Sequence, residues 1–332
     1  MTTADSKLKQ PPWLHNAAGE TRRVGVELEM NGLTLDAFAA AVAEFYQLEV
    51  TPDGRYERVL QGDPAGDWVV ELDYALLKRL GRRERKDKTL ADDIDRTTED
   101  VLAWAAEMLV PVEIVSPPLP LDRLSDVEAL VVKLRDAGAK GSSYSPVNAF
   151  GLQLNPELPS HDPALITACL QAFLCLQDWL FLRAEIDLTR RMTSYVDAFP
   201  IDYIRPLLAA DYQPDLATLI DDYLVCNPTR NRALDMLPLF LFLDEDRVRA
   251  RVDDVRIKPR PTFHYRLPGC EIDQSDWGLH VAWNDWLQVE YLAADADRLQ
   301  ACCKAYLKFL NNPVKRLFSQ WADTVEKHWL HR

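Results

Sequence analysis

The sequence predicts an α+β fold: a mainly antiparallel sheet, helices packed on one of its faces, and an added helical lobe. Two observations support this prediction. Five short segments alternate apolar and polar residues with the period of two that is typical of half-buried strands. Longer segments between and after them have helical periodicity, and the region 163–246 is almost wholly of this kind.

The first three expected strands each place acids on one face and apolar side chains on the other. Residues 22–30 present Glu27 and Glu29, which lie two apart and therefore on the same side. The next two expected strands continue the pattern, with Glu71 and Asp73 in 68–73 and Glu113 in 111–118.

The last two expected strands have polar faces without acids. Their polar positions are Gln153 and Asn155 in 151–156, and His264 and Arg266 in 262–267.

Helical periodicity fills the intervals between these strands. Helices are expected over 35–46 and 91–108, and from a capping box that begins at Ser125 to a stop at Gly138. Prolines interrupt the helical pattern of the region 163–246, and the tail 295–330 is again expected to be helical. We therefore expect one catalytic domain over 22–332, with 163–246 as an inserted lobe and 1–21 as an N-terminal extension.

The composition and net charge of the chain argue against several classes of protein. A chain of 332 residues that is 48% hydrophobic can bury a large core, and its net charge of -14 lacks the basic footprint of a nucleic-acid or anionic-membrane binder. Two apolar stretches, 164–182 and 233–243, fail as membrane spans because polar residues interrupt the first and the second is shorter than the ~20 residues required. No apolar signal-peptide core precedes residue 20, and the six cysteines form no Cys-x-x-Cys pair. We expect a cytoplasmic enzyme with neither nucleic acid nor membrane as partner.

The expected strand faces are unusually acidic. Like charges that face one another destabilise a sheet unless something neutralises them. For any single strand, a polar face turned to solvent is the simpler interpretation. Together, five acids with Arg266 as the sole full cation favour divalent metal, and such a surface suits a nucleoside triphosphate held by Mg²⁺.

These segments, in this order, resemble the amidoligase family, relatives of glutamine synthetase and glutamate-cysteine ligase. The resemblance runs from about residue 23 to residue 267 and rests on five motifs: Gly-x-Glu-x-Glu, Trp-x-Val-x-x-Asp, Glu-x-x-Ser-Pro, Gly-Leu-x-x and Tyr-Arg. It implies an ATP-dependent carboxylate-amine ligase on an antiparallel sheet that curves around a glutamine synthetase-like catalytic face. The family pattern carries over to Glu27, Glu29, Asp73, Glu113 and Arg266.

The reaction that the resemblance implies has two steps. A carboxylate of a small molecule or peptide attacks the γ-phosphate of ATP to give an acyl phosphate, and an amine then displaces phosphate to form the amide. The four matched acids are expected to hold Mg²⁺, with Glu27 also counted among the catalytic residues, and Arg266 is expected to stabilise charge on the transferred phosphoryl group. Family members are often encoded beside glutamine amidotransferase-like proteins, which implies a partner of that kind.

The chain departs from the family at one metal position. Where the family has histidines and an acid, this chain has Gln153, Asn155 and His264 instead. In one account His264 takes over as metal ligand and catalytic residue, with Gln153 or Asn155 adding a neutral oxygen, and the site then tolerates Mn²⁺ because imidazole is a softer ligand. In the other account this metal position has been lost.

Four further cations are candidates for binding the cofactor's phosphates. Arg230 and Arg232 lie beside a potential helix start, and Lys258 and Arg260 lead directly into the Arg266 segment. The alternative for Arg230 and Arg232 is pairing with nearby aspartates. No Gly-x-x-x-x-Gly-Lys-Ser/Thr loop occurs, so ATP would bind without one. Two other functions stay open: a metal-dependent phosphohydrolase, and a degenerate ligase fold that serves as a binding or scaffold protein.

Overall fold

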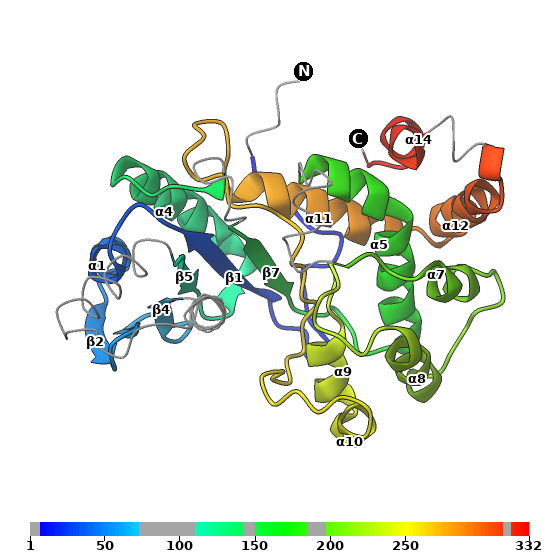
Figure 1. Cartoon of the computed structure of the whole chain (residues 1–332), viewed down its shortest axis with the longest axis horizontal. Coiled ribbons are helices and arrows are strands. Elements are labelled where there is room, and N and C mark those ends of the chain that lie inside the picture. The colour runs from blue at the N-terminus through cyan, green and yellow to red at the C-terminus, as the bar shows by residue number, and fades with distance from the viewer. Residues whose placement is uncertain (1–6, 73–109, 143–149, 185–196, 315–319, 332) are drawn as a thin grey trace, which may run out of the picture. The chain divides into compact units, whose positions relative to one another are not determined.

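The computed structural model describes residues 7–72, 110–142, 150–184, 197–314 and 320–331 (Figure 1). The chain divides into two compact units. Unit 1 comprises Met1–Val24, Gln153–Pro268 and His280–Arg332, and unit 2 comprises Gly25–Leu152 and Gly269–Leu279. The expected helix over 91–108 and the expected metal ligand Asp73 lie outside the described residues.

The strands form a mostly antiparallel open sheet, so the predicted α+β class is confirmed. The strand order is β2-β3-β4-β5-β1-β6, and β7 pairs with β1. The strands are β1 (Arg23–Met30), β2 (Glu49–Asp53), β3 (Glu57–Gln61), β4 (Trp68–Leu72), β5 (Val112–Val115), β6 (Leu119–Pro120) and β7 (Leu152–Pro156).

In unit 2, α1 (Leu35–Tyr46) packs against the sheet (Figure 1), on the face where the buried residues of β4 are apolar. Thr34 caps this helix, because its side chain accepts a hydrogen bond from the N–H of Ala37. The Tyr46 ring stacks on Trp68 of β4 at 4.7 Å between centroids. Since Trp68 and Glu71 point to opposite faces of β4, this contact places the helix on the face away from the glutamate.

The helix α4 (Leu124–Asp136) begins earlier than its predicted capping box. The Ser125 hydroxyl donates to the Asp122 carbonyl inside the preceding turn instead of capping the helix, so the prediction of a box at Ser125 is wrong. The predicted stop is confirmed, because Gly138 has a φ of 108°, which favours glycine.

The hairpin β2–β3 was not predicted from the sequence. Its turn begins at Gly54, whose φ is 70°, and the preceding Asp53 completes the Asp-Gly pair that is typical of hairpin turns. All five residues of β2 are exposed and one of them is Pro52, so the strand lacks the apolar alternation that reveals a strand in sequence.

Unit 1 is built around helices. They are α5 (Pro163–Arg183), α7 (Ile201–Leu207), α8 (Leu216–Cys226), α9 (Leu237–Leu243), α10 (Glu245–Arg249), α11 (Leu279–Ala294), α12 (Ala296–Leu310) and α14 (Trp321–His328). The predicted helical character of 163–246 and of the tail is confirmed where the chain is described, whereas α11 was not predicted.

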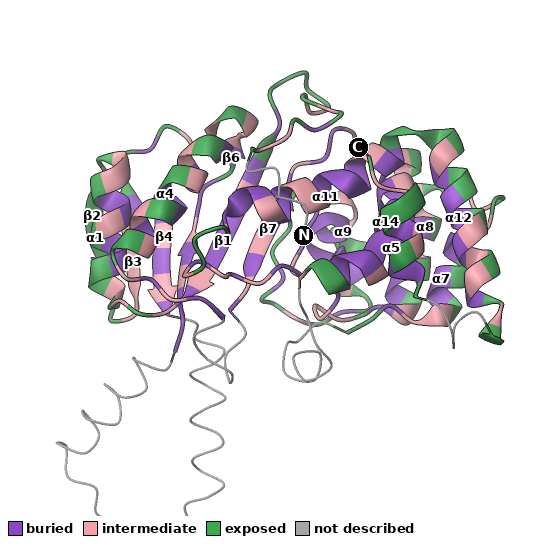
Figure 2. Cartoon of the chain, turned by 90° about the horizontal axis from the view of Figure 1, so that it is seen from above, coloured by how far each residue is buried: buried purple, intermediate pink, exposed green. Residues whose placement is uncertain are grey.

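The central helix of unit 1 is α5, which is apolar on all sides and largely buried (Figure 2). By length and composition it is the one described helix that could cross a membrane, yet 72% of its most apolar window is buried. Asp162 caps its start through the N–H of Ala164, and Pro163 occupies the first turn.

A fully buried ion pair in unit 1 joins the residue before β1 to α11. Arg22 and Glu290 are both 0% exposed, and their side chains meet in two hydrogen bonds of 2.7 and 2.9 Å. Arg22 also donates to the Glu157 and Trp13 carbonyls, and Trp286 donates to Glu290. Because every charge is paired and hydrogen-bonded, the cost of burying the pair is offset.

The expected strand 262–267 is present only as separate bridges. Thr262 pairs with Glu157, and Tyr265 pairs with Leu154 on one side and Leu234 on the other. The segment therefore lies between β7 and residues 232–235, and this pairing fixes the positions of His264 and Arg266.

Candidate functional site

A row of carboxylates crosses five adjacent strands of unit 2. The register pairs Glu29 of β1 with Glu113 of β5, and Glu113 in turn with Glu71 of β4. It continues to Glu57 of β3 and Asp53 of β2. Residues directly opposite each other share a face, and strands lie about 4.8 Å apart, so the row extends roughly 19 Å along one side of the sheet.

The sequence prediction that the acids of separate strands share one face is confirmed for Glu29, Glu71 and Glu113. Glu57 and Asp53 were not predicted to join them. The only signal for these two in the sequence was the Asp53-Gly54 turn, because their place in the row depends on the pairing of β2 and β3.

Ser116 fixes the register that aligns Glu29 with Glu113. Its backbone N–H donates to the Val26 carbonyl, and its hydroxyl accepts from the Val26 N–H at 2.8 Å. The hydroxyl also donates to the Pro117 carbonyl, so the serine extends the β1–β5 pairing where Pro117 ends it.

The Glu29 carboxylate is held in place by Gly151. The Gly151 N–H donates to Glu29 Oε2 at 2.8 Å, and the Glu29 N–H donates to the Gly151 carbonyl. A Cβ at position 151 would lie 3.2 Å from the same Oε2. A side chain at this position would therefore require the Glu29 carboxylate to shift by a few tenths of an ångström.

Glu27 lies on the same face as Glu29 but outside the row. It is 8% exposed, and its cross-strand partner on β5 is Val115. The continuing register places Val69 beside Val115, so the neighbours of Glu27 toward β4 are apolar.

The residue types of the row fit hard divalent cations such as Mg²⁺, which prefer carboxylate oxygens. Adjacent acids at direct cross-strand positions also repel one another. Within the described part of the chain, no three acidic, histidine or cysteine side chains are grouped closely enough to hold a metal ion as they stand. The metal-ligand assignments of Glu27, Glu29, Asp73, Glu113, Gln153 and His264 therefore stay predictions.

In unit 1, His264 joins a small buried polar cluster. Its Nε2 lies 2.8 Å from Gln153 Oε1, and its Nδ1 lies 3.6 Å from Oδ2 of Asp235, which is wholly buried. Both Nδ1 and Oδ2 are buried and lack a hydrogen-bond partner within the described residues. Asp235 was not predicted as a site residue, because its place opposite His264 comes from the 234–265 bridge.

The side chain of Arg266 contacts the backbone of Arg230 in the same unit. Nη1 of Arg266 donates to the Arg230 carbonyl, and the Arg266 N–H donates to the Ala233 carbonyl at 2.9 Å. Burial, and after it the charge of Arg266, lower the pKa of Arg230. The positive charge of Arg266 therefore disfavours the protonated form of Arg230.

The other three residues that were predicted to bind phosphate are Arg232, Lys258 and Arg260. Arg232 is 7% exposed and donates to Asn227 Oδ1 at 2.9 Å, to the Ala198 carbonyl at 2.5 Å and to the Cys226 carbonyl at 3.2 Å. These contacts give Arg232 a structural role in its loop. Lys258 and Arg260 are exposed. Phosphate binding by all three stays a prediction.

The comparison with protein families agrees with the motifs. A family model described as "Putative amidoligase enzyme" matches residues 20–288, which includes every described strand and both Arg230 and Arg266. Among curated proteins, no sequence matches the chain. Because the family model spans most of the chain, the protein belongs to the putative amidoligase enzyme family.

Proposed function

We propose that the protein is an ATP-dependent carboxylate-amine ligase that forms an amide through an acyl phosphate. The observation that supports this most strongly is the carboxylate row, in which Glu29, Glu113 and Glu71 occupy directly opposed positions on three adjacent strands. Membership of the amidoligase family gives this acidic face its chemical interpretation.

The acids at the β1–β5 end of the row would hold Mg²⁺, which supplies charge neutralisation for the phosphates of ATP when it is bound. Glu29 is the best-positioned ligand, because Gly151 fixes its carboxylate. Glu113 is central, because it faces an acid on both sides. Asp73 follows β4 directly in sequence and is a further candidate ligand.

The proposed reaction has two steps, and each step forms one bond and breaks another. An oxygen of the substrate carboxylate attacks the γ-phosphorus, the bond to ADP breaks, and the acyl phosphate forms. The amine then attacks the acyl carbon and loses a proton, and inorganic phosphate leaves. Water has to be excluded between these steps, since it would hydrolyse the acyl phosphate.

The proposal is tested by comparing three near-isosteric variants along the row. Calorimetry measures Mg-ATP binding, and a screen of acid and amine pairs measures ADP release, with mass detection of the condensed product. Glu29→Gln and Glu113→Gln should abolish turnover. Glu57→Gln should retain it within about threefold, because Glu57 lies two strands, or roughly 10 Å, from Glu113.

Each alternative function has a distinct outcome in this assay. ATP hydrolysis that is independent of any acid or amine would indicate a phosphohydrolase. No Mg-ATP binding by the wild-type protein would indicate a binding or scaffold role. Equal losses in all three variants would show that the row acts as a diffuse electrostatic field and that no metal site exists at its β1–β5 end.

A further inference from the structure

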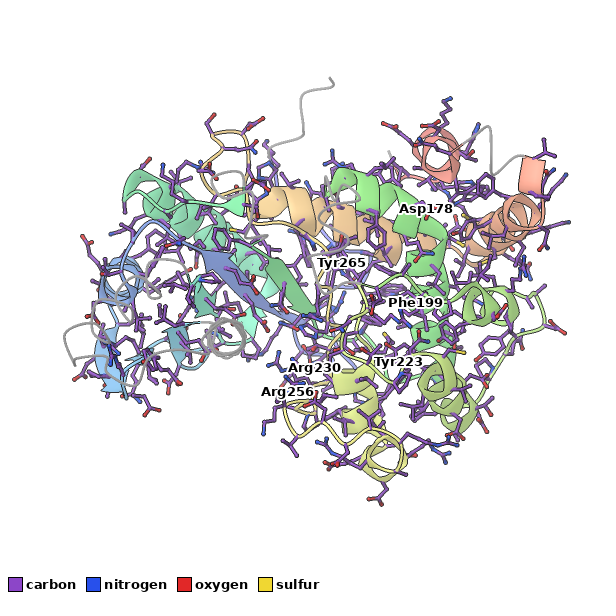
Figure 3. The ribbon with its side chains drawn as sticks, in the orientation of Figure 1. Asp178, Phe199, Tyr223, Arg230, Arg256 and Tyr265 are labelled. Carbon is purple, nitrogen blue, oxygen red and sulfur yellow. The ribbon has the colours of Figure 1, made fainter. Side chains whose placement is uncertain are left out.

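Three thiols of unit 1 meet where two of its helices pack together. Cys175 lies on α5, Cys302 and Cys303 lie on α12, and the two helices lie side by side (Figures 1 and 2). The Cys175 and Cys303 sulfurs are 3.7 Å apart, and the Cys302 thiol also contacts Cys175. Asp178, labelled in Figure 3, marks the next turn of α5. A bond between Cys175 and Cys303 would therefore join α5 to α12.

The distance between the Cys175 and Cys303 sulfurs is short enough for a disulfide to form with small movements. A disulfide bond is about 2.05 Å long, so the two sulfurs need to approach each other by roughly 1.7 Å. Side-chain rotation and small shifts of the two helices can supply this movement. Because the fold holds both thiols together, the second thiol reacts at a high effective concentration once the first is oxidised.

Burial determines when this reaction can occur. Cys175 is 0% exposed and Cys303 is 4% exposed, so an oxidant does not reach either thiol while the helices are packed. Burial also raises the pKa of the Cys175 thiol, which keeps it in the less reactive protonated form. Oxidation therefore requires α12 to separate locally from α5, and the disulfide then forms when the helices pack together again.

We propose that Cys175 and Cys303 are an oxidative modification site, at which a reversible disulfide links α12 covalently to α5. With hydrogen peroxide as the oxidant, one thiolate attacks a peroxide oxygen, the O–O bond breaks, and a sulfenic acid and water form. The second thiol then attacks the sulfenic sulfur, the S–S bond forms, and a second water leaves with the thiol proton. Two thiols thus lose two electrons to the peroxide, and a dithiol reductant restores both thiols.

The disulfide would restrict movement within unit 1. Cys175 and Cys303 are 128 positions apart, so the bond closes a long loop that contains the 262–267 segment with His264 and Arg266. Crosslinks that close long loops are expected to stabilise most, because they restrict the unfolded chain. We expect oxidation to raise Tm by roughly 10 °C or more.

The test uses the full chain, oxidised with hydrogen peroxide and compared with a sample that is afterwards reduced with dithiothreitol. The chain has six cysteines, and the number of free thiols counted after unfolding should fall by two. Tandem mass spectrometry should identify the link between Cys175 and Cys303. The protein should remain a monomer on a non-reducing gel, and dithiothreitol should reverse the gain in Tm.

Three variants assign the modification to this pair. Cys175→Ala should abolish both the link and the gain in Tm, whereas Cys302→Ala should keep both because Cys303 is the partner. Cys226→Ala is the matched control, since Cys226 ends α8 and is partly exposed, and it should also keep both. Melting curves of the reduced proteins show whether each variant is folded.

Oxidised wild-type protein that keeps all six thiols would overturn the proposal. A link to Cys302, a disulfide-bonded dimer, or oxidation to sulfinic acid without a link would overturn it as well. An equal gain in Tm in the Cys175→Ala variant would show that oxidation stabilises the protein at another position. None of these measurements depends on the proposed ligase function.

Discussion

Removing the central charge of the carboxylate row should stabilise the metal-free protein. Glu113 faces Glu29 on one side and Glu71 on the other, and all three side chains are partly exposed. Two unit charges about 5 Å apart repel by roughly 0.8 kcal/mol in water and by about 3 kcal/mol at an effective dielectric constant of 20. Partial exposure favours the lower value, so Glu113→Gln relieves about 1–2 kcal/mol over two pairs.

This change is large enough to measure by thermal melting. For a folding unit of 150–250 residues, 1 kcal/mol shifts Tm by about 2–4 °C, so Glu113→Gln should melt roughly 2–8 °C above the wild-type protein in buffer with a metal chelator. Added MgCl₂ should raise the wild-type Tm more than NaCl at equal ionic strength does, and most of this gain should be lost in the variant.

A matched control separates the row from general surface charge. Glu44 of α1 is 77% exposed and pairs with Lys133 at 2.7 Å, so Glu44→Gln should leave the metal-free Tm unchanged or slightly lower. The reasoning is refuted if Glu113→Gln melts at or below the wild-type temperature without metal while MgCl₂ stabilises both proteins equally.

Three further predictions concern stability and the position of one carboxylate. Burial raises the pKa of Asp285 to about 6, so the folded protein binds this proton more tightly than the unfolded chain and loses stability as pH rises from about 4 to 6. In denaturant titrations, Asp285→Asn should therefore be more stable than the wild-type protein by up to about 3 kcal/mol at pH 7 and by little at pH 4. An equal difference in stability at both pH values would contradict this prediction. Glu290→Gln leaves the buried Arg22 charge uncompensated and should lower the free energy of unfolding by about 3–5 kcal/mol, whereas a loss below about 1 kcal/mol would show that the pair contributes little. Gly151→Ala should displace the Glu29 carboxylate and reduce Mg-dependent ATP turnover while circular dichroism stays unchanged; wild-type kinetics would show that this contact does not position the site.

Local sequence patterns predicted the elements whose side chains alternate clearly. The strand around Glu27 and the helix from Leu35 to Tyr46 were both predicted, because buried apolar positions recur with the strand or helix period. The apolar residues that produce the pattern in the sequence are the residues that are buried in the structure.

The carboxylate row was predictable only in part. Alternation alone places Glu29, Glu71 and Glu113 on polar faces, but which acids stand opposite each other depends on strand order and register. Those depend on the β2–β3 hairpin, whose exposed first strand gives little signal, and on Ser116, whose hydroxyl bonds to β1.

The polar groups of unit 1 show why buried contacts escape sequence patterns. Asp235 and His264 are 29 positions apart and meet through a single bridge between irregular segments. Arg22 and Glu290 are 268 positions apart, and nothing near either residue in the sequence indicates that the two charges are buried together. Such long-range pairs are selected by tertiary packing, which no local period encodes.

The most direct test of the proposed function is trapping of the activated carboxylate. The protein is incubated with Mg-ATP, the acid identified in the screen and hydroxylamine in place of the amine, and the products are resolved by mass spectrometry. The proposed mechanism predicts a hydroxamate of the acid with equimolar ADP and inorganic phosphate, and none from the Glu113→Gln variant. AMP and pyrophosphate in place of ADP and phosphate would indicate an acyl-adenylate, and would contradict the acyl-phosphate mechanism.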